Sequence, residues 1–185
     1  SGKNSSNDTY TVNITSKLRG ITAVQLEVLC DPSLPGNGPG RAINGNFSLT
    51  EFRVVAAPLE KKTETAPILL HNLQADFSQG SHGGWPVTAV NDGNPKTGWS
   101  VDPEEGIPHV AIFETNPPIG FDGGTNLTFT IEQGDNEHSI GRFKLSATTS
   151  KPPITLPDGY YVARAGLGNR MFSEIPPAKK GGTFV

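Results

Sequence analysis

The sequence contains one cysteine, Cys30, and this scarcity excludes two common ways of holding a chain together. A single thiol cannot close a disulfide bond within the chain, and no cysteine and histidine residues have the spacing of a zinc site. A Cys-x-x-Cys-His motif is also missing, so we expect no covalently attached haem in this segment. Cys30 is instead expected to fill space as a small apolar side chain at the end of a strand.

Long hydrophobic runs and a strong charge of one sign are missing as well. No run of about 18 apolar residues occurs, so we expect no membrane span, and no signal peptide is visible. The formal net charge is −3, from 15 basic and 18 acidic residues, without the basic stripe that binds nucleic acid. Membranes and nucleic acids are therefore not expected partners. Ser1–Gly2 looks like the remainder of a cleaved tag, so we expect the chain to be a piece of a longer protein.

Sustained helical periodicity is absent too, while turn-forming residues are abundant, with 22 glycines and 16 prolines. Stretches rich in β-branched and aromatic residues lie between these turns, and several alternate apolar with polar side chains, as half-buried strands do. The pattern predicts strands over residues 9–14, 21–29, 47–56, 68–73, 86–90, 109–115, 126–132 and 139–148. The spacing of the turn signals favours an all-β fold, an antiparallel β-sandwich or barrel.

The strand pattern also divides the chain. Residues 1–8 are expected to be a disordered tag or linker, residues 9–150 a β-sandwich binding module, and residues 151–185 a C-terminal extension or a final wrapping segment. Residues 31–46 are too rich in glycine, proline and asparagine for regular structure. Because strands flank this stretch closely, we expect an ordered, functional loop. The two prolines at 117–118, with the following Asp-Gly-Gly, are expected to form a turn between two strands.

Two groups of motifs resemble known families. Residues 75–78 (ADFS) and 89–99 (AVNDGNPKTGW) resemble the discoidin, or coagulation-factor type, galactose-binding-like module. Residues 32–52 and 140–146 resemble the sandwich found in planctomycete-type multidomain proteins with cytochrome c domains. The resemblance, which covers roughly residues 10–150, implies a jelly roll, carbohydrate binding and a structural calcium ion (Ca²⁺). One fold hosts many functions, so each of these is an expectation.

Asp92, Asn94 and Thr97 offer the kinds of oxygen that calcium prefers: a carboxylate, an amide, a hydroxyl and the carbonyls of a turn. Glu51 would add a second carboxylate from a neighbouring strand, with Glu114 as its substitute. The acidic strand here precedes the Asp-Gly-Asn turn, whereas it comes near the end of the discoidin pattern, which weakens the assignment of Glu51. The alternative is a simple turn in which Asp92 hydrogen-bonds its own backbone. The residues leave both open, and the resemblance favours the ion.

A second set of residues has the chemistry of a sugar site. Trp85, among glycines, is a candidate stacking platform, because a pyranose has an apolar C–H face and a polar rim. Trp99 follows a turn directly and is the better candidate for the core. Arg41, Asn46 and His82 are candidates to contact hydroxyls, and the Arg41 guanidinium would also suit an acidic polysaccharide. For each of these the plain structural role is the alternative: packing for the tryptophans, loop anchoring for Arg41.

Catalytic constellations are absent from the sequence. No Gly-x-Ser-x-Gly elbow occurs, and Glu104 and Glu105 are adjacent, so in a strand they would point to opposite faces. We therefore expect no enzyme. The pattern and the resemblance favour a non-catalytic carbohydrate-binding module that tethers a larger extracytoplasmic, cytochrome c-containing protein to a polysaccharide. The alternative is a structural or protein-interaction domain that packs against neighbouring domains of the same chain.

Overall fold

The computed structural model describes residues 4–61, 63–134, 136–156 and 173–174. Their regular secondary structure consists of strands and two single-turn 3₁₀ helices, η1 (Pro35–Asn37) and η2 (Val87–Ala89). The strands are β1 (Asp8–Ser16), β2 (Ile21–Val28), β3 (Leu49–Pro58), β4 (Ala66–Pro67), β5 (Leu69–Ala75), β6 (His109–Ile119), β7 (Thr125–Gln133), β8 (Phe143–Thr148) and β9 (Ser173–Glu174). The predicted all-β class is confirmed.

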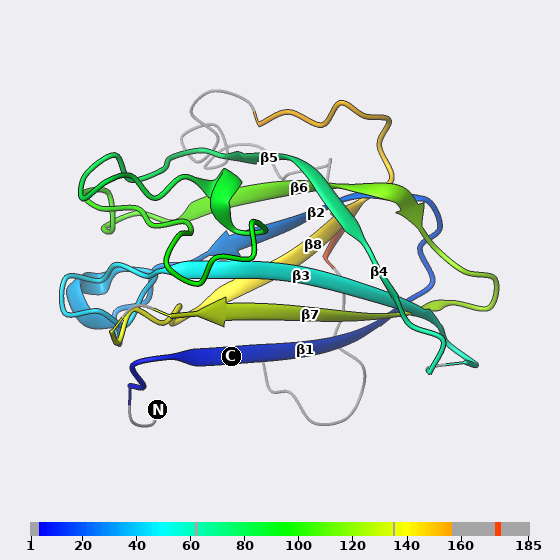
Figure 1. The fold of residues 1–185 in the computed structure, drawn as a ribbon, viewed down its shortest axis with the longest axis horizontal. Coiled ribbons are helices and arrows are strands. Elements are labelled where there is room, and N and C mark those ends of the chain that lie inside the picture. The colour runs from blue at the N-terminus through cyan, green and yellow to red at the C-terminus, as the bar shows by residue number, and fades with distance from the viewer. Residues whose placement is uncertain (1–3, 62, 135, 157–172, 175–185) are drawn as a thin grey trace.

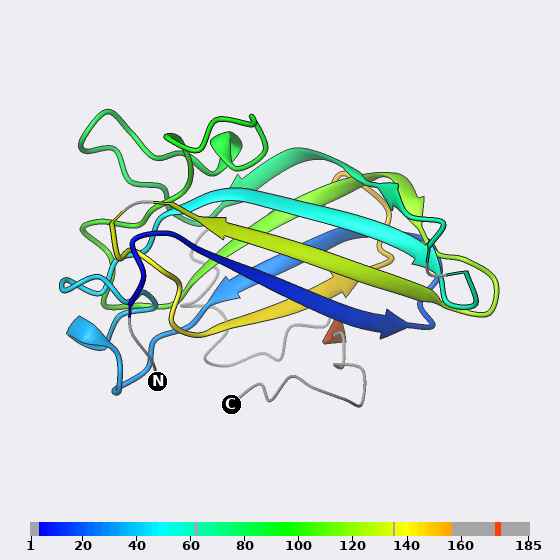
Figure 2. The same cartoon turned by 60° about the horizontal axis from the view of Figure 1, so that its bottom comes forward.

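The strands form two antiparallel sheets that pack face to face (Figures 1 and 2). The first sheet has the order β1-β7-β3-β4, and the second has the order β5-β6-β2-β8-β9. The connections β1–β2, β2–β3, β6–β7 and β7–β8 each cross from one sheet to the other, so the chain joins the two layers repeatedly. The fold is an antiparallel β-sandwich, as predicted. The narrower likeness to a galactose-binding-like jelly roll stays a prediction.

The core between the sheets is built on aromatic side chains. Phe52 on β3 stacks on Phe113 of β6, with ring centroids 4.4 Å apart, and lies 6.1 Å from the ring of Phe129. Trp99 is 0% exposed and meets Phe47 edge to face at 5.0 Å. Edge-to-face and offset-stacked pairs are the favoured arrangements of aromatic rings. The prediction that Trp99 belongs to the core is therefore confirmed, and Trp99 is not available to stack on a ligand.

The structure corrects two strand predictions. Residues 86–90 contain η2 and not a strand, because turn hydrogen bonds join Ala89 N to the Pro86 carbonyl (3.0 Å) and Val90 N to the Val87 carbonyl (3.2 Å). Residues 117–118 lie inside β6 and do not turn the chain. Prolines are tolerated there because the pairing with β2 is irregular between Ile21 and Ala23, so this stretch supplies no ladder hydrogen bond.

The strand β2 is buried on both faces, whereas its alternating sequence predicts a half-buried strand. Val24, Leu26 and Val28 belong to the inner core, while Gln25 and Glu27 alternate with them and are also buried. A covered outer face explains this burial, because a polar residue on an open sheet would be exposed. The alternation thus predicts the strand correctly, but its prediction that one face is exposed is wrong.

Residues 151–156 supply part of that cover. Ile154 is buried and packs with Ala23 and Ile112 on the outer face of the second sheet. Its backbone is held as well, since Ile154 N donates to Glu114 Oε1 (2.7 Å) and Gln74 Nε2 donates to the Ile154 carbonyl (2.8 Å). Further along, β9 pairs with β8. The start of the predicted extension therefore belongs to the sandwich, and the rest of 151–185 lies outside the described residues apart from β9.

Replacing Ile154 with alanine tests whether this segment contributes to stability. Removing a buried isoleucine side chain costs about 2–5 kcal/mol, so Ile154→Ala is expected to lower the free energy of unfolding by about 2 kcal/mol, at the low end for a segment near the edge of the fold. The measurement is urea denaturation followed by tryptophan fluorescence. Thr155→Ala is the control, because Thr155 is exposed. Equal and small effects of both changes would show that the segment is only a linker.

Candidate functional site

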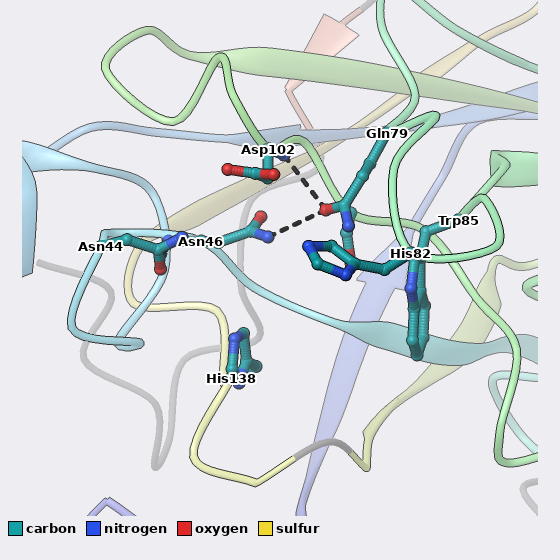
Figure 3. Close-up of a pocket in the computed structure, with 8 residues that line it drawn as sticks. Asn44, Asn46, Gln79, His82, Trp85, Asp102 and His138 are labelled. Atoms are coloured by element: carbon teal, nitrogen blue, oxygen red, sulfur yellow. Dashed lines mark hydrogen bonds between the residues drawn. The ribbon is translucent and has the colours of Figure 1, made fainter.

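The loops between β2 and β3, between β5 and β6, and between β7 and β8 meet at one end of the sandwich (Figure 1). Between them is a hollow of about 320 Å³, called the loop-end hollow below. Such a volume lies at the small end of the range for ligand pockets. Its lining residues come from all three loops and are drawn in Figure 3: Asn44, Asn46, Gln79, His82, Trp85, Ser100, Asp102 and His138.

Two side-chain amides form the floor of the hollow (Figure 3). Gln79 Oε1 accepts hydrogen bonds from Asn46 Nδ2 (3.1 Å) and from the backbone N–H of Asp102 (3.2 Å). Asn46 Oδ1 accepts from the backbone N–H of Val101 (3.1 Å). A backbone N–H can only donate, so these contacts fix which end of each amide is oxygen. The floor therefore has one defined arrangement of donors and acceptors.

One wall of the hollow is a tight hairpin. The backbone N–H of Trp85 donates to the Gln79 carbonyl (2.8 Å), and that of Gly84 donates to the Ser81 carbonyl (3.0 Å). His82 and Gly83 have φ values of 53° and 88°, as both central residues of a type I′ turn must. The turn places His82 at the tip and Trp85 at the base, both facing the hollow (Figure 3).

The opposite wall is the glycine-rich loop that the sequence predicts to be ordered. It is packed against itself so closely that a Cβ atom at Gly40 would lie 1.8 Å from the Asn46 carbonyl oxygen. Asn44 closes this wall onto the β5–β6 loop, because Asn44 Nδ2 donates to Glu105 Oε1 (2.8 Å). Asn44 Oδ1 accepts from the backbone N–H of Asn46 (3.2 Å). Both ends of the Asn44 amide thus hold the loop and leave little for a ligand.

Asp102 is the carboxylate that faces the hollow. Ser81 Oγ donates to Asp102 Oδ2 at 3.2 Å, which joins the carboxylate to the hairpin wall. The carboxyl group of Glu105 lies close enough to Asp102 for their charges to interact. Burial raises the pKa of Glu105 above its ordinary 4.5, and the neighbouring Asp102 raises it further. Glu105 therefore binds a proton at a higher pH than an ordinary glutamate does.

The structure brings together three of the five residues that the sequence predicts for ligand binding. Asn46, His82 and Trp85 line the hollow. Asn46 supports the floor through its amide, so its role is to position Gln79. Arg41 is not among the lining residues, and its backbone N–H donates to the Ser139 carbonyl (2.7 Å). Trp99 is in the core, where its indole Nε1 donates to the Phe77 carbonyl (2.8 Å).

Sequence reasoning missed Gln79 and Asp102, the two most direct polar groups of the hollow. Neither lies in a motif, and they are separated by 22 residues of loop. The only local signal is the position of Gln79 at the start of a Gly- and Ser-rich turn that leads to Trp85. The contact of Gln79 with the loop after Trp99 depends on the tertiary structure, so no local sequence pattern predicts it.

Asp92, Asn94 and Thr97 form a turn that is held by hydrogen bonds within it. Asp92 Oδ1 accepts from the backbone N–H of Asn94 (2.8 Å), and Asp92 Oδ2 accepts from Thr97 Oγ1 (2.8 Å). Asn94 Oδ1 accepts from the backbone N–H of Lys96 (3.1 Å). The hydrogen bonds that the turn alternative predicts, with Asp92 bonded to nearby backbone, are therefore present.

Glu51 lies close to this turn, because Gly93 and Asp92 are among the groups that affect the pKa of its carboxyl group. It is 2% exposed, on the outer side of β3. Burial raises the pKa of Glu51 above 4.5, against the opposite effects of Arg53 and of the Gly93 N–H. Arg53 lies 3.4 Å from Glu51 Oε2, whereas the buried Oε1 has no hydrogen-bond partner among the described residues. Glu114, the proposed substitute, is engaged by residues 151–156 instead.

These residues meet the needs of calcium only in part. A calcium ion takes six to eight oxygens, and Glu51 Oε1 is an oxygen that lacks a partner. Both oxygens of Asp92 are already engaged, however, and Arg53 already places a positive charge beside Glu51. In the described part of the chain, no three His, Cys, Asp or Glu side chains are grouped so as to hold a metal. Calcium at this turn stays a prediction.

Behind the hollow, the buried imidazole of His109 connects two stretches of the β5–β6 loop. Its Nδ1 lies 3.3 Å from Asp76 Oδ2, and its Nε2 lies 2.8 Å from the Glu104 carbonyl oxygen. Burial opposes the charged imidazolium, but the bonds to Asp76 and to the Glu104 carbonyl outweigh burial and raise the pKa of His109 above 6.5. Because both partners are acceptors, this geometry requires a proton on each ring nitrogen.

Comparisons with known proteins identify no relative of the chain. No family model matches it, and no curated protein or solved structure matches it either. Within the described residues, the structure has no helix with the length and apolar character needed to cross a membrane. The function is therefore argued from the geometry of the loop-end hollow.

Removing the Asp92 carboxylate tests the turn and the ion separately. In calcium-free buffer, Asp92→Ala is expected to lower the free energy of unfolding by about 1 kcal/mol, because two exposed hydrogen bonds are lost. Asp92→Asn, which keeps an acceptor, is expected to cost less. If calcium binds at the turn, millimolar calcium should raise the thermal midpoint of the wild type and leave those of the two Asp92 variants unchanged. An unchanged wild-type midpoint with calcium and with chelator rules the ion out.

The raised pKa of His109 predicts how stability depends on pH. The folded protein binds this proton more tightly than the unfolded chain does, so the contribution is complete below about 6.5 and is lost as pH rises through the folded value. The raised pKa values of Glu51 and Glu105 act in the same direction from about 4.5 upward. The urea midpoint is therefore expected to be higher at pH 6 than at pH 8.5. His109→Gln should flatten this dependence, and His138→Gln should leave it unchanged.

Proposed function

We propose that the protein is a non-catalytic carbohydrate-binding module and that the loop-end hollow is its site. The observation that carries this proposal is the convergence of Asn46, His82 and Trp85 on one hollow. These residues come from two loops and were singled out by the sequence for their chemistry alone. Gln79 and Asp102 add a buried amide and a carboxylate to the same hollow.

The chemistry of the hollow complements a sugar. A pyranose presents an apolar face of C–H groups and a rim of hydroxyls, each of which both donates and accepts. Trp85 is half-buried at the base of the hairpin, with an indole face beside the hollow. Asp102 supplies acceptors and Gln79 supplies a donor at the back (Figure 3). A flat ring beside fixed polar groups is the arrangement that sugar binding needs.

The arrangement of the carboxyl groups supports binding over hydrolysis. Glycosidases keep two carboxyl groups about 5–9.5 Å apart, so that the sugar and a water molecule fit between them. Among the residues that line the loop-end hollow, Asp102 is the single carboxylate, so the lining does not supply such a pair.

The wider role rests on the resemblance of residues 32–52 and 140–146 to sandwiches of multidomain cytochrome c proteins. On that basis the module would tether a larger extracytoplasmic protein to a polysaccharide. The site is consistent with a tether, because the loop-end hollow lies at one end of the sandwich, whereas the β3–β4 and β6–β7 connections lie at the other (Figure 1). A polysaccharide bound at one end leaves the rest of the surface for neighbouring domains.

One observation favours the alternative, an interaction domain that packs against neighbouring domains. A groove of about 230 Å³ runs between β3 and the β4–β5 stretch, and apolar residues such as Val54, Ile68 and Leu69 line much of it. Leu69 is 61% exposed. Apolar patches of this kind mark interaction sites when they are large. This one is small, so it is the second candidate.

Affinity gel electrophoresis with Trp85→Ala tests the proposal against the alternative. The wild type is expected to be retarded by at least one polysaccharide, and Trp85→Ala is expected to weaken binding about tenfold, the equivalent of one aromatic contact of about 1.4 kcal/mol. Leu69→Ala is the matched control, since Leu69 lies in the groove and away from the hollow. Absence of retardation on every polysaccharide would favour the interaction domain.

A further inference from the structure

The donor that Gln79 presents to the loop-end hollow is fixed by the backbone. Gln79 is 6% exposed, and its Oε1 is held by Asp102 N–H and by Asn46 Nδ2. The amide nitrogen Nε2 must then point the other way, and no hydrogen bond to another described residue engages it. Nε2 is not a fully buried atom, so water or a ligand oxygen in the hollow can accept a hydrogen bond from it. The hollow thus contains a hydrogen-bond donor, Gln79 Nε2, that is available to an acceptor atom of a ligand.

The lining also contains an acceptor, the Asp102 carboxylate. Its Oδ2 accepts from Ser81, which orients the carboxylate toward the hairpin wall. Gln79 and Asp102 are joined through the Asp102 backbone N–H, so their side chains are neighbours at the back of the hollow (Figure 3). A donor next to a charged acceptor matches two adjacent hydroxyls, one accepting from the amide and one donating to the carboxylate.

The charge of the hollow determines which sugars are compatible. Asp102 lines it and Glu105 adjoins Asp102, whereas the lining residues include no lysine and no arginine. Two histidines, His82 and His138, are the other titratable groups of the lining. His138 Nδ1 lies 3.0 Å from the Asn136 carbonyl oxygen, so this nitrogen carries the proton in the neutral ring. The lining therefore contains one carboxylate and no lysine or arginine to neutralise it.

We propose that the loop-end hollow selects an uncharged sugar, whose neighbouring hydroxyls bind the Asp102 carboxylate and the Gln79 amide nitrogen, and that it rejects uronates and sulfated sugars. This inference rests on the proposed function and narrows it to a substrate class. It replaces the acidic polysaccharide that Arg41 suggested in the sequence, because Arg41 does not line the hollow. A carboxylate that accepts hydrogen bonds from sugar hydroxyls would repel the carboxylate or sulfate group of an anionic sugar at the same distance.

The experiment compares neutral and acidic polysaccharides in one affinity gel series. The neutral gels contain xyloglucan, galactomannan or mixed-linkage β-glucan, and the acidic gels contain polygalacturonate, alginate or carrageenan. The wild type is expected to be retarded only by neutral gels. Asp102→Asn keeps the shape and loses the charge, and it is expected to weaken that binding at least tenfold. Glu60→Gln is the charge-matched control, because Glu60 is exposed in the β3–β4 turn at the opposite end of the sandwich.

The outcomes separate this inference from the function on which it rests. Retardation by acidic gels that Trp85→Ala abolishes would overturn the neutral-sugar inference and leave carbohydrate binding in place. Unchanged neutral binding by Asp102→Asn, with an unchanged thermal midpoint, would also overturn it. Because Asp102 lies in a packed loop, Gln79→Glu is the second variant: it exchanges the donor for an acceptor and is expected to abolish neutral binding. Absence of retardation on all gels would overturn the proposed function itself.

Discussion

The candidate site depends on one small group of buried hydrogen bonds at the end of the sandwich. Backbone N–H groups of Val101 and Asp102 orient the side chains of Asn46 and Gln79, which come from two different loops. A buried amide is costly when it is unpaired and has a definite orientation when it is paired. These bonds therefore join the loops and orient the donors and acceptors of the hollow with the same few atoms.

The strands illustrate what a single sequence can predict and what it cannot. The stretch 126–132 alternates strictly, and β7 lies where the pattern places it, because one face of the strand meets the core. The strand β2 alternates just as clearly and is nevertheless buried on both faces. Part of its cover is Ile154, more than 120 residues later in the chain, and no local pattern carries that contact. The alternation therefore predicts a strand and which of its faces meets the core. It does not predict whether the other face is covered.

The candidate site follows the same division. Trp85 was recognisable as an aromatic residue among glycines, and His82 and Asn46 as side chains able to contact sugar hydroxyls. Gln79 and Asp102 lie in no sequence motif, and their roles depend on their tertiary contacts. Trp99 and Arg41 have the right chemistry and the wrong location. Composition thus selected candidates, and only the folded arrangement of three loops could show which of them share a hollow.

The two walls of the hollow differ in how freely their sequence can change. At Gly40 any side chain would collide with backbone of the same wall, so that wall is closed to variation. At Gly83, on the hairpin, a Cβ atom would meet nothing within 4 Å, and only the positive φ restricts the choice of residue. Descendants of this sequence could therefore acquire new ligand preferences through the hairpin while the glycine-rich wall stays constant. For protein engineering, the hairpin is the part to randomise and the opposite wall is the scaffold to keep.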